Sequence, residues 1–115
     1  MNHTNKRITR FDAYDVALEI IRALRPLVPQ IRTKDASLAK QIRDAGSSIP
    51  LNVKEGWRRL GKDRRYHYSV AAGSADEVSS ALDTAAAWGY IEEAANADAQ
   101  ELLDRELAML YRLTH

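Results

Sequence analysis

The sequence has no cysteine, and only three prolines and five glycines interrupt its 115 residues. Without cysteine it can form no disulfide, cysteine-ligated zinc site or thiol nucleophile. Neither sign of charge dominates: 17 basic and 16 acidic residues leave a net charge of +1, so any nucleic-acid contact must rest on a local patch. Apolar runs are too short to span a membrane, and the polar, basic residues 1–10 do not resemble a secretory signal. We therefore expect a cytoplasmic, bacterial-type protein without membrane contact.

Helical periodicity appears four times, whereas strand patterns are almost absent, so the sequence predicts an all-α fold. The connections between the periodic segments are short, which favours antiparallel neighbours and an up-down-up-down four-helix bundle. We expect residues 1–11 to form a flexible N-terminal tail and residues 12–115 to form the single four-helix bundle domain. The four predicted helices cover residues 13–28, 35–59, 62–88 and 97–113.

Residues that favour helix ends set these boundaries. Asp12 and Asn96 are suitable N-caps for the first and last helices. Pro26 and Pro29 should weaken and then end the first helix, because proline lacks the backbone N–H that a helix interior requires. Gly89 is a plausible C-cap for the third helix.

Pro50 falls in the middle of the second predicted helix. An interior proline removes one backbone hydrogen bond and costs about 3 kcal/mol. The apolar stripe formed by Ile42, Ile49 and Val53 nevertheless continues through it. The pattern therefore predicts one continuous second helix kinked at Pro50, rather than two helices.

Polar residues gather on the facing sides of the second and third helices: Ser48, Asn52, Glu55, Ser74 and Glu77. We favour a structural polar network that satisfies backbone groups opened by Pro50. The alternative is a paired-carboxylate catalytic site made of Glu55 and Glu77. Di-iron bundles require a histidine three residues after a glutamate, and this sequence has no such pair. We therefore expect no metal and no cofactor. We also expect no catalytic residue.

The strongest local charge bias lies at the turn between the second and third helices. Five cations occur there within eight positions: Arg58, Arg59, Lys62, Arg64 and Arg65. Such a cluster predicts contact with the phosphate backbone of RNA or DNA. The alternative is a solvated, charge-rich turn, or one that forms salt bridges with a neighbouring subunit.

Aromatic residues are too many for so small a bundle to bury. Some should therefore form an apolar interface between subunits. The candidate interface residues are Trp57, Tyr68, Trp88, Tyr90 and Tyr111.

Two separated motifs give the sequence a family resemblance. Residues 48–57, SIPLNVKEGW, are similar to the SIPxNIxEG-aromatic motif of the 23S rRNA intervening-sequence protein family, and residues 72–78, AGSADEV, to its AxGSxxE motif. Residues 88–91 resemble its LGYI sequence at the end of the third helix, and residues 11–16 its entry into the first. The matching positions are Ser48, Pro50, Asn52, Glu55, Gly56, Gly73, Ser74 and Glu77, with Val53 and Lys54 departing from the usual residues.

The resemblance implies a small helical bundle that assembles as a homopentamer, and it implies no biochemical activity. A related branch, the accessory variability determinants of diversity-generating retroelements, implies basic pentamers that bind nucleic acid and a reverse transcriptase. The near-zero net charge of this chain departs from that branch.

Together these observations predict a non-enzymatic homo-oligomeric scaffold or adaptor whose basic turn binds RNA or DNA. The alternative is a purely protein–protein interaction module with no nucleic-acid role. A third reading is an enzyme that uses Glu55 and Glu77.

Overall fold

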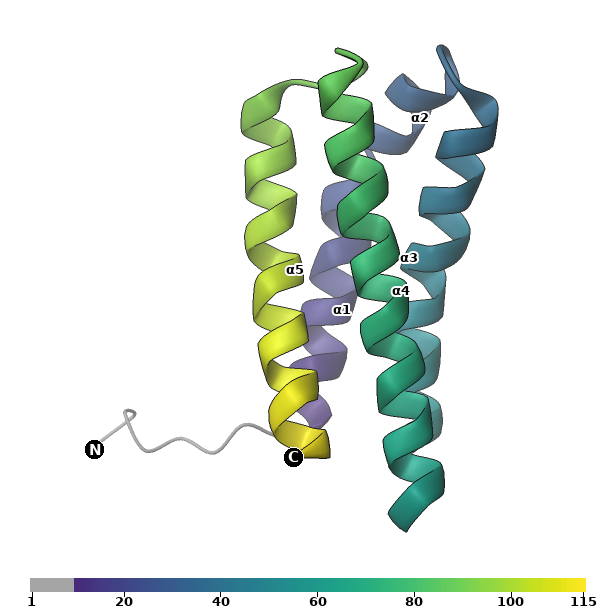
Figure 1. Ribbon diagram of the computed structural model, residues 1–115, viewed down its shortest axis with the longest axis vertical. Helices are drawn as coiled ribbons and strands as arrows, with labels where there is room; N and C mark the ends of the chain where they lie inside the picture. The colour runs from purple at the N-terminus through teal and green to yellow at the C-terminus, as the bar shows by residue number, and fades with distance from the viewer. Residues whose placement is uncertain (1–9) are drawn as a thin grey trace, which may run out of the picture.

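The computed structural model describes residues 10–115, which form five helices and no strand (Figure 1). The predicted all-α class is therefore confirmed for this part of the chain. Residues 1–9, most of the predicted N-terminal tail, lie outside the described residues, and the remaining two begin the first helix. The helices are α1 (Arg10–Leu24), α2 (Leu27–Arg32), α3 (Ala36–Trp57), α4 (Gly61–Ala87) and α5 (Glu93–Thr114).

The first predicted helix is divided in the structure. α1 ends at Leu24, and α2 begins at Leu27 directly after Pro26. Pro29 is tolerated in the first turn of α2, where backbone N–H groups have no partner within the helix. The prediction of one helix over residues 13–28 was wrong, because each proline suits a helix start better than a helix interior.

α3 passes through Pro50 without a break, as predicted. Asp35 caps its N-terminus by accepting a hydrogen bond from the backbone N–H of Leu38 at 2.9 Å. The apolar stripe that includes Ile42 and Ile49 is fully buried. The kink at Pro50 stays a prediction.

α4 ends as its sequence predicts. Gly89 adopts a φ of +81°, a conformation that glycine tolerates without steric cost. The N–H of Gly89 bonds to the carbonyl of Ala86, and the N–H of Tyr90 to that of Ala85, each at 2.9 Å. This pattern is a Schellman motif, which closes the C-terminus of the helix.

α5 begins at Glu93, earlier than predicted, and Asn96 is not its N-cap. Asn96 is buried within the helix and donates a hydrogen bond to Asp83 of α4 at 2.9 Å. Its short polar side chain therefore ties two helices together instead of ending one.

The four long helices lie alongside one another, and α2 lies at one end of the molecule (Figure 1). Hydrogen bonds from Ser74 to Ser48, and between Glu77 and Gln41, show that α3 and α4 run antiparallel. The up-down-up-down order of all four long helices stays a prediction.

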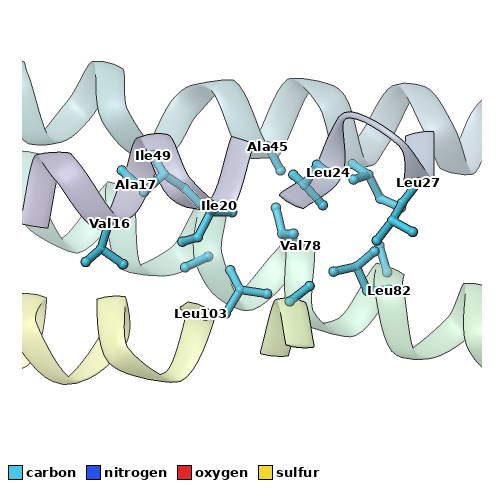
Figure 2. Close-up of a cluster of buried hydrophobic side chains, with 14 of the residues drawn as sticks. Val16, Ala17, Ile20, Leu24, Leu27, Ala45, Ile49, Val78, Leu82 and Leu103 are labelled. Atoms are coloured by element: carbon cyan, nitrogen blue, oxygen red, sulfur yellow. The ribbon is translucent and has the colours of Figure 1, made fainter. Parts of the chain in front are cut away.

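Apolar side chains from every helix meet in one core. The side chains labelled in Figure 2 come from α1, α2, α3, α4 and α5: Val16, Ala17, Ile20, Leu24, Leu27, Ala45, Ile49, Val78, Leu82 and Leu103. α3 and α4 pack most extensively, whereas α1 and α3 pack much less extensively. Small residues such as Ala71 and Ala75 are fully buried in α4, which allows its neighbours to approach closely.

Candidate nucleic-acid interface

The turn between α3 and α4 holds the five predicted cations, and they have different environments. Arg64 is half-buried and reaches back to the end of α3. Its Nε donates to the carbonyl of Gly56 at 3.1 Å, and its Nη2 to that of Trp57 at 3.3 Å. The Gly56 carbonyl also accepts a hydrogen bond from the backbone N–H of Arg59 at 3.2 Å. Arg64 therefore adds side-chain donors at the C-terminus of α3, where the last carbonyls lack intrahelical partners.

Arg59 forms an ion pair on its own helix face. Its Nη2 lies 2.6 Å and its Nε 2.9 Å from the same carboxylate oxygen of Glu55. The hydrogen bond and the positive charge of Arg59 lower the pKa of Glu55, and the charges of His67 and Arg58 act in the same direction. Glu55 in turn raises the pKa of Arg59. The charge of Arg59 is therefore largely balanced locally.

Arg58, Lys62 and Arg65 are exposed. These three residues, called the exposed cation triad below, lie at the end of the molecule where α3 finishes and α4 begins. Tyr66, which follows Arg65 in the chain, is 64% exposed. Cations with an adjacent exposed ring are the elements that single-stranded nucleic acid requires for phosphate contact and base stacking.

Trp57 is not an open stacking surface. Its ring packs against Phe11 with a centroid distance of 4.7 Å and against Tyr14 at 5.3 Å. The Nζ of Lys54 lies 4.8 Å from the same ring, in cation–π geometry. Trp57 therefore anchors the start of α1 to the end of α3.

The polar network between α3 and α4 contains some of the predicted residues and adds one. Ser74 donates to the Oγ of Ser48 at 2.8 Å, and the Nδ2 of Asn52 donates to the carbonyl and the Oγ of Ser48. The Nδ1 of His67 lies 3.1 Å from the Oδ1 of Asn52. We call these four residues the α3–α4 polar network; His67 was not predicted in it.

Glu55 and Glu77 are not brought together. Glu77 accepts a hydrogen bond from Gln41 at 3.3 Å, whereas Glu55 pairs with Arg59. Gln41 and Glu55 are 14 positions apart on α3, so at 1.5 Å per residue their backbone positions are about 20 Å apart along the helix. Paired catalytic carboxylates act within about 10 Å of each other. The structure therefore does not bring Glu55 and Glu77 together as a carboxylate pair.

The predicted interface aromatics divide between core and surface. Tyr68 is 1% exposed, so its ring belongs to the core of the chain and is not available to a partner. Trp88, which is 69% exposed, stacks on Tyr90 with a centroid distance of 6.3 Å. Tyr111 is also exposed and stacks on His115 at 3.9 Å.

Glu106 was not predicted from the sequence. It is fully buried on α5, and neither carboxylate oxygen has a hydrogen-bond partner. Burial raises its pKa to about 8, against a smaller opposing effect of Arg105. Its position three residues after Leu103 and four before Leu110, both buried, could have revealed it.

Within residues 10–115, no three His, Cys, Asp or Glu side chains lie close enough together to hold a metal ion. None of the helices described is long and apolar enough to cross a membrane. The described residues form an all-α framework that carries exposed cations at one end and two exposed, stacked aromatic pairs.

Comparison with known proteins places the chain in a family. The model of the 23S rRNA-intervening sequence protein family matches residues 8–112. The chain therefore belongs to this family, and the predicted resemblance is confirmed. No relative was found among the curated proteins.

A solved structure shares the fold. It is a protein of unknown function from the S23 ribosomal protein family of Bacteroides thetaiotaomicron, 20% identical in sequence, with a TM-score of 0.80. The match covers 89% of this chain and 97% of that one. Neither this description nor that of the family names an enzymatic activity.

Proposed function

We propose that this protein is a non-enzymatic, homo-oligomeric scaffold of the bacterial cytoplasm that binds RNA or DNA through the α3–α4 turn. Each subunit is an up-down-up-down four-helix bundle kinked at Pro50, and the family resemblance implies five subunits. The observation that carries the proposal is the exposed cation triad of Arg58, Lys62 and Arg65 beside the exposed ring of Tyr66. Repeating this turn around a ring would multiply a weak local patch into a larger phosphate-binding surface.

A test of this proposal should not substitute all five cations of the turn, because two of them have structural partners. Substituting Arg64 would also damage the end of α3, and substituting Arg59 would leave Glu55 unpaired. The variant should therefore change only the exposed cation triad to serine. A matched control changes Arg25, Arg32 and Lys34, three exposed cations near α2 at the other end of the molecule.

Binding of a fluorescent single-stranded RNA or DNA is measured at several salt concentrations. We expect the triad variant to bind at least about tenfold more weakly. Its plot of log K against log salt concentration should also be shallower, by about 0.7 for each phosphate that the protein no longer neutralises. The control should bind as the unaltered protein does. Equal weakening in both variants, or none in either, would refute a specific role for the turn.

The second candidate function is a protein–protein interaction module without a nucleic-acid role. It is favoured by the stacked pair of Trp88 and Tyr90, because exposed aromatic residues are common anchors at protein interfaces. A protein partner captured through these rings should stay bound in salt that releases nucleic acid. Salt-resistant partner binding with no affinity for RNA or DNA would favour this second function.

A further inference from the structure

A shallow groove runs between α1 and α3, the neighbouring long helices that pack least extensively. Two adjoining hollows of about 330 and 230 Å³ share Ile21 and Ser47 in their walls. A third hollow, of about 150 Å³, shares Val28 and Arg43 with the second and continues the depression between α2 and α3. We call this continuous depression the α1–α3 groove.

The walls of the groove are regular. One wall includes residues 14, 18 and 21 of α1 and residue 25 just after its end, and the other includes residues 43, 47, 51 and 54 of α3. Each wall thus follows the spacing of one helix face over about three turns, or about 16 Å. Two helix faces at this spacing form a trough into which a third helix can pack its own ridge of side chains.

The floor of the groove is apolar and partly open to solvent. Leu18, Ile21 and Val28 are only half-buried, and Leu51 at the edge is 68% exposed. Ser47 is exposed at the centre, where its small side chain leaves space between the first two hollows. Covering these apolar atoms with another helix would remove them from water and favour binding.

The charges of the groove all have one sign. Every ionisable residue that lines the three hollows, apart from the phenol of Tyr14, is a cation: Arg25, Arg32, Lys40, Arg43 and Lys54. Asp44, outside the lining, pairs with Lys40 at 2.7 Å and lies 3.9 Å from Arg43, which offsets part of this charge. Arg25 and Lys54 lie on opposite walls and near opposite ends of the trough.

We propose that the α1–α3 groove binds an acidic amphipathic helix of a partner protein, about three turns long. Its apolar face would cover Leu18, Ile21 and Leu51, and its carboxylates would meet the cations along both walls. The inference rests on the adaptor function proposed above and assigns it a protein partner, at a surface separate from the exposed cation triad.

The test uses two labelled 16-residue peptides. Both place leucine on one helical face; one has glutamate on the flanks of that face and the other has lysine. Fluorescence anisotropy should give at least about tenfold tighter binding of the glutamate peptide. The double variant Arg25→Glu, Arg43→Glu should reverse this preference, whereas the control Arg58→Glu, Arg65→Glu, with the same change of net charge, should leave it intact.

A second variant tests the floor of the groove without disturbing the core. Ser47→Trp fills an exposed position, so the protein should keep its helical circular dichroism and lose affinity for the glutamate peptide. Equal binding of the two peptides, no binding of either, or unchanged affinity in Ser47→Trp would overturn the proposal. So would a fall in oligomer mass caused by Ser47→Trp, because the occupant would then be a second copy of this chain. Nucleic-acid binding, measured separately with the triad variant, reports on the α3–α4 turn alone.

Discussion

Gly56 and Tyr68 show how tightly single residues are specified where α3 meets α4. A Cβ atom at position 56 would lie 2.5 Å from Cε1 of the Tyr68 ring, and that ring is 1% exposed and has no open space to move into. Gly73 offers a contrast, because a Cβ atom there would meet nothing within 4 Å. The family motifs contain both glycines, yet only Gly56 is required by packing.

We therefore expect Gly56→Ala to lower the free energy of unfolding by about 1–3 kcal/mol through overpacking. Gly73→Ala should raise it by about 0.5–1 kcal/mol, since alanine favours the helix more than glycine does. Urea denaturation measures the free energy of unfolding of both variants, and the slope of that free energy against urea concentration should stay unchanged. A Gly56→Ala protein as stable as Gly73→Ala would contradict the close approach of the ring.

Glu106 makes stability depend on pH. Its pKa is raised from 4.5 to about 8 in the folded chain, so between these values the folded state holds a proton that the unfolded state has released. The contribution of Glu106 to the free energy of unfolding should therefore be largest below about pH 4.5 and should fall as pH rises toward 8. The decrease amounts to about 5 kcal/mol at most, at 1.36 kcal/mol per pKa unit.

Glu106→Gln should remove most of this dependence and stabilise the protein at pH 8, which thermal unfolding at several pH values would show. Glu77→Gln, on an exposed side chain, serves as the control and should keep the slope of the unaltered protein. An unaltered protein whose stability rises between pH 5 and 8, with Glu106→Gln following the same course, would contradict the buried neutral carboxyl.

At the scale of elements, the α3–α4 polar network fixes the register of the two most extensively packed helices. Asn52 is its centre, because its side chain meets Ser48 on α3 and His67 on α4. A slip of one helix along the other would leave these half-buried groups without partners, at a cost of about 1–3 kcal/mol for each.

Asn52→Ala should accordingly destabilise the protein by about 1–2 kcal/mol. Gln41→Ala also removes a hydrogen bond between α3 and α4, but an exposed one at 3.3 Å, and should change stability by less than about 0.5 kcal/mol. Thermal unfolding of the two variants side by side provides the comparison. Equal effects would mean that the network contributes no more than a surface hydrogen bond.

Sequence periodicity was sufficient for the all-α class, the continuity of α3 through Pro50 and the glycine cap of α4. It failed where one residue type suits two different structural roles. Pro26 could end a helix or precede a new one, and Asn96 could cap α5 or bond across to α4. Glu77 shares a helix face with Ser74, yet its carboxylate turns to Gln41, a choice that depends on packing between helices.

At the scale of the whole molecule, the exposed aromatic residues favour self-association. Phe11, Trp88 and Tyr111 remain 56–69% exposed in a single chain, and placing such rings against a neighbouring copy would remove apolar surface from water. Static light scattering should therefore give a mass several times that of one 115-residue chain, and five times for the proposed homopentamer.

A matched pair of variants locates the association surface. Trp88→Ser should lower the mass if the stack with Tyr90 lies between subunits, whereas Lys34→Ser, another exposed substitution, should leave it unchanged. A single-chain mass for the unaltered protein at micromolar concentration would refute self-association altogether.

α4 extends without interruption from the exposed cation triad to the aromatic pair at its far end. Its 27 residues span about 40 Å at 1.5 Å each, close to the 42 Å long axis of the molecule. Side-chain hydrogen bonds to α3 and to α5 keep this rod from sliding. Two ligands held at its opposite ends would therefore sit at a constant separation, and the chain would serve as a spacer of defined length between them.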